Sequence, residues 1–244
     1  MMDDVIEPVW AAPARVKAWT TTRQGGVSLG PWRNLNLGAA CGDNARAVAE
    51  NRRRLAARLP AGPLWLSQVH GGRVIEHPGA VTDSPEADAV LTSRPGEVCA
   101  VLTADCLPVL LADLDGDQVA TAHAGWRGLA AGVLENTVRA MSAAPERIAA
   151  WLGPAICQDH YEVGPEVRAA FARQEADAAA AFLPHHDRWL ADLHMLARLK
   201  LERAGLTQVS SAGLCTACDP QRFFSHRRDA VTGRMASVIW IEAG

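Results

Sequence analysis

Several features that would assign this chain to a common class of proteins are missing from its sequence. There is no excess of positive charge, because 24 Lys and Arg residues stand against 27 Asp and Glu residues, a formal net charge of -3. Nucleic-acid binding is driven largely by neutralisation of phosphates, so we expect no nucleic-acid partner. The start, MMDDVIEPVW, has neither the positive n-region nor the apolar stretch of a secretory signal. We therefore expect no export and a cytoplasmic protein.

Long apolar runs and a dense set of cysteines are also absent. The longest apolar runs, such as Cys106–Ala112, are far shorter than the roughly 20 residues of a membrane-spanning helix. We expect a soluble protein without a membrane partner. Six cysteines in 244 residues are too few for a disulfide framework, so we expect them to be reduced, as buried thiols or metal ligands.

Neither of the two glycine-rich phosphate-binding patterns, GxGxxG and GxxxxGK[ST], occurs in the chain, and there is no internal repeat. Because 49% of the residues are hydrophobic and 21% are charged, the core should be well filled. Strand and helix patterns do not alternate regularly along the sequence. Together these features predict an α+β fold, with one domain spanning residues 1–244 and mixed β-sheets flanked by helices.

Alternation and β-branched residues predict strands, and periodic apolar positions with capping residues predict helices. The expected strands are Val16–Thr21, Leu64–Val69, Ala89–Thr92, Val98–Leu102, Leu107–Leu111, Val119–His123, Ile148–Leu152 and Ser237–Ile241. The expected helices are Asn44–Leu59, Trp126–Met141, Pro165–Arg173 and a segment between Asp192 as N-cap and Gly205 as C-terminal stop.

His70, Cys106 and His123 are the most informative residues of the chain. They lie in the apolar segments LWLSQVHGGRV, AVLTADCLPVLL and VATAHAGWRG, each at the end of an expected strand. Site residues commonly occupy such strand-to-loop transitions. One thiolate and two imidazoles can hold a tetrahedral Zn²⁺ with its fourth position open, and without a metal they can form a Cys-His nucleophile pair.

Less specific interpretations of the same residues remain open at this stage. Most buried imidazoles are simply hydrogen-bonded, and most buried cysteines behave as small apolar residues. The spacings between the three residues match no compact metal motif. Arg127 lies at the first turn of an expected helix, where it could bind a phosphate or carboxylate or simply pair with acidic neighbours at the surface.

Cys215 and Cys218 form a CxxC pair, a common half of a zinc site, with His226 nearby. No matching second half is apparent, so a closed structural site would need a fourth ligand from elsewhere in the chain. A redox role would need a thioredoxin-like context, which is absent. The role of this pair stays open.

The chain resembles, over nearly its whole length, the bacterial laccase-domain family, also called multicopper polyphenol oxidase or YfiH-type proteins. The segments that carry the resemblance are TTRQGGVSLGPWRNLNLG, SQVHGGRV, ADAVLT, LTADCLPVLL, AHAGWRGLAAGV, LGPAI, YEVGPEV, CTACDPQRFFSHRRD and GRMASVIWI. The resemblance implies a fold similar to the catalytic domain of cytotoxic necrotizing factor. It also implies a zinc site at His70, Cys106 and His123. Because copper has a high intrinsic affinity for such ligands, we expect Cu²⁺ to bind there when copper is in excess.

The activity that the resemblance implies is phosphorolysis of adenosine, inosine and methylthioadenosine, with some adenosine deamination. The partners would be purine nucleosides and phosphate. We expect Arg127, together with the N-terminus of its helix, to bind the phosphate. Arg23 and Gly25, in a loop open to close backbone approach, are candidates for substrate binding, and Glu162 for proton transfer. A surface arginine and a solvated glutamate are the alternatives.

Three other functions compete with this one. A Cys-His thiol amidohydrolase would use Cys106 as nucleophile and His123 as base, and the resemblance connects such a role with editing of peptidoglycan precursors. A copper-dependent polyphenol oxidase is disfavoured, because the eight histidines include no His-X-His pair of the kind that a multicopper centre requires. The third alternative is a protein that binds metal or nucleoside without turnover. The sequence does not fix the oligomeric state.

Overall fold

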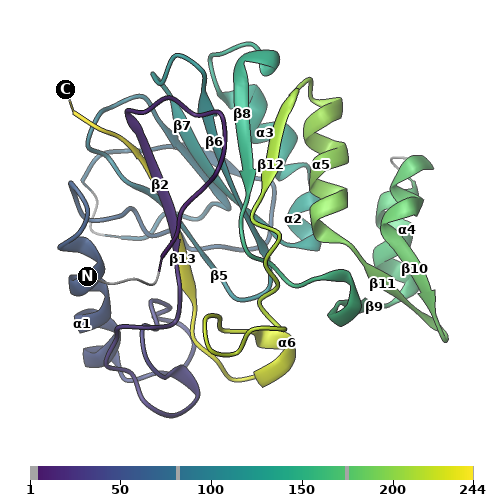
Figure 1. Ribbon diagram of the computed structural model, residues 1–244, viewed down its shortest axis with the longest axis horizontal. Helices are drawn as coiled ribbons and strands as arrows, with labels where there is room; N and C mark the ends of the chain where they lie inside the picture. Colours follow the sequence, from purple (N-terminus) through teal and green to yellow (C-terminus); the bar gives the residue numbers. More distant parts are fainter. Residues whose placement is uncertain (1–4, 81–82, 174–175, 244) are drawn as a thin grey trace.

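The strands form three sheets in the computed structural model, which describes residues 5–80, 83–173 and 176–243 (Figure 1). The central sheet has six strands in the order β12-β8-β6-β7-β4-β3, and a second sheet has four in the order β1-β2-β13-β5. The third sheet, β10-β11-β9, is small and lies to one side with α4 (Figure 1). The central sheet is mixed, since β12–β8 and β3–β4 pair in parallel and the others antiparallel.

The strands of the central sheet are β3 Val74–Glu76, β4 Ala89–Thr92, β6 Leu107–Asp113, β7 Val119–Ala124, β8 Ile148–Leu152 and β12 Gln208–Ser211. Those of the second sheet are β1 Val5–Ile6, β2 Val16–Thr21, β5 Cys99–Thr103 and β13 Met235–Ile241, and those of the third are β9 Glu162–Val163, β10 Phe182–His185 and β11 Arg188–Ala191. The helices are α1 Ala45–Ala56, α2 Trp126–Ala130, α3 Val133–Ala140, α4 Pro165–Ala172, α5 Leu193–Arg203 and α6 His226–Asp229.

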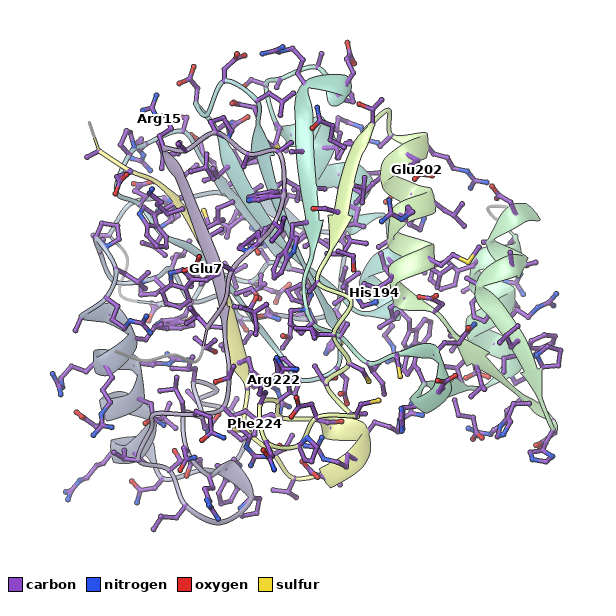
Figure 2. All side chains as sticks on the ribbon, viewed as in Figure 1. Glu7, Arg15, His194, Glu202, Arg222 and Phe224 are labelled. Carbon is purple, nitrogen blue, oxygen red and sulfur yellow. The ribbon has the colours of Figure 1, made fainter. Side chains whose placement is uncertain are left out.

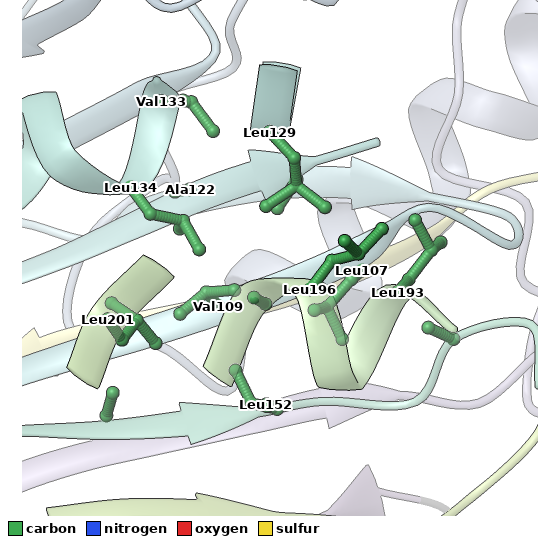
Figure 3. Close-up of a cluster of buried hydrophobic side chains, with 14 of the residues drawn as sticks. Leu107, Val109, Ala122, Leu129, Val133, Leu134, Leu152, Leu193, Leu196 and Leu201 are labelled. Atoms are coloured by element: carbon green, nitrogen blue, oxygen red, sulfur yellow. The ribbon is translucent and has the colours of Figure 1, made fainter. Parts of the chain in front are cut away.

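Alternating side chains divide the core into layers. On β6, Leu110 packs toward the four-stranded sheet, where it meets Ile239 of β13, whereas Val109 packs on the opposite face of its sheet. That face is covered by α3 and α5, whose Leu134 and Leu196 lie in the same apolar cluster as Val109 (Figure 3). Because successive residues of a strand point to opposite faces, one strand supplies both cores. Each buried leucine stabilises the fold by about 1.5–3 kcal/mol.

Most of the expected elements are confirmed. The predicted bounds of β2, β4 and β8 match the structure, and the strands at β5, β6, β7 and β13 are present with small shifts at their ends. The N-cap of α5 is also as expected, because Asp192 Oδ1 accepts a hydrogen bond from Met195 N at 2.9 Å. The single-domain α+β class with mixed sheets and flanking helices holds.

Two expectations were wrong. Leu64–Val69 is not a strand: it makes only isolated bridges at Leu64 and Ser67. The Gln68 side chain replaces the backbone of a neighbouring strand as hydrogen-bond partner of Leu102: it donates to Leu102 O at 2.9 Å and accepts from Leu102 N at 2.7 Å. The single helix expected over Trp126–Met141 is broken into α2 and α3, because Gly132 adopts a left-handed φ of 80° between them.

Among the described residues, none of the helices is both long and apolar enough to cross a membrane.

Candidate functional site

The structure brings His70, Cys106 and His123 together from three separate segments. One ligand atom from each lies within 4.8 Å of the others, and the two imidazole rings meet edge to face with centroids 4.7 Å apart. His123 is buried near the end of β7, Cys106 is half-buried before β6, and His70 is exposed. The three side chains therefore form a small cluster that is buried on the side of His123 and exposed to solvent on the side of His70.

Cys106 is held by the turn between β5 and β6. Asp105 adopts a left-handed φ of 88° there, which Asp tolerates better than most residues. The Asp105 carboxylate accepts hydrogen bonds from Thr216 Oγ1 and from Arg227 N, both at 2.6 Å. Its backbone carbonyl accepts one from Ile156 N at 3.0 Å. Contacts from distant segments thus fix the residue before the thiol.

Asp88, immediately before β4, holds the ring of His123 and the backbone at His70. Its carboxylate is fully buried and accepts from His123 Nδ1 at 2.8 Å. It also accepts from the backbone N–H groups of His70 at 2.9 Å and Gly71 at 2.7 Å. A carboxylate at Nδ1 leaves Nε2 of His123 as the free ligand atom and orients the ring, the usual outer-shell arrangement of metal-binding histidines.

The electrostatics favour a thiolate. Burial raises the pKa of Cys106, but the charge of His123 and hydrogen bonds from both imidazoles outweigh it and bring the pKa down to about 6. Burial lowers the pKa of His123, yet the charge of Cys106 and the hydrogen bond to Asp88 raise it to about 9. Without a metal, the pair would carry opposite charges near pH 7.

A metal ion fits this donor set. Three soft or borderline ligand atoms converge, one histidine is oriented by a buried carboxylate, and the fourth side is open, as in catalytic zinc sites. Gly125 keeps the space clear, because a Cβ there would lie 2.8 Å from Cys106 Sγ and 3.4 Å from His70 Nδ1. The residues present are therefore suited to hold Zn²⁺, and Cu²⁺ would also accept them.

A cavity of about 520 Å³ opens directly over the cluster. This volume lies within the range of small-molecule sites, about 300–1,000 Å³. Its lining includes two arginines, Arg52 and Arg234, with Trp65 and Gln68 from the segment that leads to His70. The guanidinium of Arg52 stacks on Trp65 at 4.3 Å from the ring centroid and donates from Nε to a backbone carbonyl. The site thus combines a stacking surface with positive charge.

The other residues predicted from sequence do not line this cavity. Arg127 lies at the start of α2 as expected, but it is exposed and stacks on Trp126 at 4.4 Å. Arg23 donates to the backbone carbonyls of Arg33 and Pro220 and lies over the ring of Phe224 at 4.5 Å. These contacts describe a side chain that holds two loops together. Figure 2 shows Phe224 beside α6.

Glu162 and Gly25 are likewise away from the cavity lining. The Glu162 carboxylate accepts from His185 Nδ1 at 3.0 Å and from Arg188 Nη1 at 3.4 Å. Gly25 is exposed with a left-handed φ of 84°, and its carbonyl accepts a hydrogen bond from Arg54.

Sequence reasoning missed Asp88, Gln68, Arg52 and Arg234. Asp88 had a usable signal, since it is a lone carboxylate at the start of the apolar strand in the segment ADAVLT. A charge in such a place is costly unless it is paired. The two arginines gave no local signal, because α1 and the segment before β13 approach the site only in the folded chain.

A second cluster of ligand-type side chains is present around the CxxC pair. Cys215 and Cys218 lie with Cys157 and His160, all four ligand atoms being within 4.8 Å of one another. His226 is not a member. Its Nδ1 faces the carbonyl of Ala230 at 2.7 Å, and the residue lines the cavity over the first cluster.

Comparisons with known proteins agree with the fold. The model of a family described as multi-copper polyphenol oxidoreductase laccase matches residues 17–242. The chain is 53% identical to an Escherichia coli protein named purine nucleoside phosphorylase YfiH, over 98% of this chain and 100% of that protein. A Pseudomonas aeruginosa protein, also named a purine nucleoside phosphorylase, is 50% identical over 99% and 100% of the two chains. The crystal structure of Neisseria meningitidis protein NMB0706 matches with a TM-score of 0.95 at 46% identity, covering 99% and 100%.

Proposed function

The chain belongs to the multi-copper polyphenol oxidoreductase laccase family, whose YfiH-type members it matches along their whole length, and on this premise we propose that it is a purine nucleoside phosphorylase. The substrates would be adenosine, inosine or methylthioadenosine together with phosphate. The observation that carries the proposal is the cavity, where a His-Cys-His cluster, an aromatic side chain and two arginines line one space. The relatives named purine nucleoside phosphorylases support it.

Phosphorolysis breaks the bond between the anomeric carbon of the ribose and N9 of the purine, and it forms a bond from that carbon to a phosphate oxygen. The phosphate dianion must be held against the ribose, and the leaving base needs a proton. Arg52 and Arg234 are the cations of the cavity lining that suit the phosphate. The purine base would stack on the side chain of Trp65.

His70, Cys106 and His123 would hold the metal ion, which when bound would supply Lewis acidity toward an oxygen atom of the substrate or of water. Asp88 keeps the Nδ1 proton on His123, so that Nε2 faces the cluster. The turn at Asp105 holds the Cys106 thiolate in place. The same arrangement could support attack of water on C6 of adenine, and we propose adenosine deamination as a secondary activity.

Product analysis tests the proposal. Purified protein is incubated with inosine, adenosine or methylthioadenosine, with and without phosphate, and free base and ribose 1-phosphate are quantified. The proposal requires free base to appear only with phosphate, and to disappear in His70→Ala. Equal release of base without phosphate, or none under either condition, would refute it.

The phosphate ligand is tested separately. Arg52→Ala or Arg234→Ala should raise the KM for phosphate about 10- to 100-fold, since a hydrogen bond to a charged group contributes about 1.5–3 kcal/mol. Arg127→Ala tests the ligand predicted from sequence in the same assay. Arg139, an exposed residue of α3, provides the matched control as Arg139→Ala. If Arg127→Ala were the only one of these variants to change the KM for phosphate, the phosphate site would lie at α2.

One observation favours a second candidate function. Cys106, His123 and Asp88 form a thiolate, imidazole and carboxylate series in which the carboxylate orients the imidazole at 2.8 Å. This is the arrangement of a thiol hydrolase, and it would act on an amide without a metal. Loss of amidase activity on alkylation of metal-free protein would support this function. Restoration of phosphorolysis by added zinc would favour the first.

A further inference from the structure

Cys157, His160, Cys215 and Cys218 form a cluster that the proposed reaction does not use. Cys157 and His160 border the short 3₁₀ helix Gln158–His160 after β8, and the two other cysteines follow β12. The parallel pairing of β8 with β12 brings the two loops side by side, and a further bridge joins Ala155 to Cys215. A CxxH pair therefore faces a CxxC pair.

We propose that these four residues bind a second, structural Zn²⁺ with a Cys₃His ligand set. Structural zinc sites are four-coordinate, use cysteine and histidine, and space each ligand pair by two to a few residues. Both pairs here have two intervening residues. The first cluster has three protein ligands and an open side, whereas this one has the four that close a tetrahedron.

The distances agree with an ion at the centre. In a tetrahedron with Zn–S bonds of about 2.3 Å and Zn–N bonds of about 2.0 Å, the ligand atoms are roughly 3.5–3.8 Å apart. Cys157 Sγ lies 3.9 Å from Cys218 Sγ, and His160 Nδ1 lies 3.2 Å and 3.5 Å from these two sulfur atoms. A disulfide between Cys157 and Cys218 would require the two sulfur atoms to approach to about 2.05 Å.

Backbone donors support the third sulfur. Cys215 Sγ accepts from the N–H groups of Cys157 at 3.2 Å and Cys218 at 3.4 Å. Such bonds hold a ligand sulfur in place and favour its charged form, as outer-shell contacts do at metal sites. His160 and Cys218 are exposed, so an ion can enter from the surface.

The site has a clear structural effect, because both of its loops touch the turn that carries Cys106. Ile156 N donates to the Asp105 carbonyl at 3.0 Å, and Thr216 Oγ1 donates to the Asp105 carboxylate at 2.6 Å. A zinc ion between the loops would lock these donors together. The second site would therefore stabilise one wall of the first without contacting substrate.

Metal content measured by mass spectrometry of the whole protein tests the proposal. The wild-type protein and the double variant Cys157→Ser/Cys218→Ser are loaded with zinc and desalted to remove unbound metal. The double variant should then hold one equivalent of zinc fewer than the wild type. Cys41→Ser, which changes a cysteine outside both clusters, should match the wild type. Cys106→Ser should lose the equivalent of zinc bound by His70, Cys106 and His123. Absence of zinc from that first cluster would therefore be seen separately from absence of zinc from the second. Equal zinc content in wild type and double variant would overturn the proposal.

A second measurement on the wild-type protein does not depend on the variants folding. Zinc-loaded protein is treated with an alkylating reagent, and the labelled cysteines are identified by peptide mass spectrometry. Cys157, Cys215 and Cys218 should be protected and should become reactive after a chelator is added. Equal labelling of the exposed Cys218 with and without chelator, or a disulfide among these residues in freshly purified protein, would refute a zinc site.

Discussion

Replacement of Asp88 by Asn is the sharpest test of how this site is built. The Asp88 carboxylate accepts from His123 Nδ1 at 2.8 Å and from the backbone N–H groups of Val69, His70 and Gly71 at 3.2, 2.9 and 2.7 Å. An asparagine keeps the shape, but one oxygen becomes an NH₂ group that faces donors. Each hydrogen bond to a charged acceptor contributes about 1.5–3 kcal/mol. Since the NH₂ group cannot accept the two hydrogen bonds that the replaced oxygen accepted, the free energy of unfolding should fall by about 3–6 kcal/mol.

The effect on metal binding follows from the same contacts. Loss of an outer-shell partner commonly weakens metal affinity by about 10- to 100-fold, so the zinc Kd of Asp88→Asn should rise by this factor, and phosphorolysis at limiting zinc should fall in parallel. Asp117, an exposed carboxylate paired with Arg15, provides the control as Asp117→Asn. Competition with a chromophoric chelator measures the Kd, and thermal denaturation measures stability. An unchanged zinc Kd in a folded Asp88→Asn protein would refute the role assigned to Asp88.

Three further predictions concern the same region and the core. Gly125→Ala should abolish zinc binding at the first cluster while the chain stays folded, because the new Cβ would lie 2.8 Å from Cys106 Sγ; metal analysis and circular dichroism check both parts. In metal-free protein, alkylation of Cys106 should rise with pH through a midpoint near 6, since the positive charge of His123 lowers the thiol pKa, and a midpoint near 8.5, the ordinary cysteine value, would contradict this. Leu196→Ala should lower the free energy of unfolding, measured in urea, by about 2–5 kcal/mol, because Leu196 is buried between α5 and the central sheet. A decrease below about 1 kcal/mol would show that the core around Leu196 repacks.

The sequence predicted those parts of the fold that depend on local patterns. β4 and β8 were found with their bounds because short buried runs of apolar residues end at turn-forming residues. The approach of His70, Cys106 and His123 was anticipated because each follows an apolar segment. The strand expected at Leu64–Val69 failed for a non-local reason: Leu64 and Leu66 are buried, but the Gln68 side chain makes the hydrogen bonds that a neighbouring strand would otherwise make.

The remaining site residues could not be predicted, because their role depends on long-range pairing. Arg52 reaches the cavity only because α1 packs beside the four-stranded sheet. Cys157 and Cys215, 58 residues apart, meet because β12 pairs with β8 in parallel. In the sequence, Cys157 and His160 form a CxxH pair far from the CxxC pair, and His226 stands closer to it. Proximity along the chain therefore does not indicate which histidine joins the cluster.

The two clusters differ in a way that sets their chemistry. The first has three ligand atoms and a cavity of about 520 Å³ on its open side, so a bound ion could still accept an oxygen atom from substrate or water. The second has four ligand atoms, and an ion held by all of them would have no position left for a reactant. Both clusters connect to Asp105, the second through Ile156 and Thr216 and the first through the neighbouring Cys106. Removal of the structural ion should therefore loosen the Cys106 turn and slow catalysis, whereas removal of the first ion should abolish metal-dependent steps and leave the second loop pair intact.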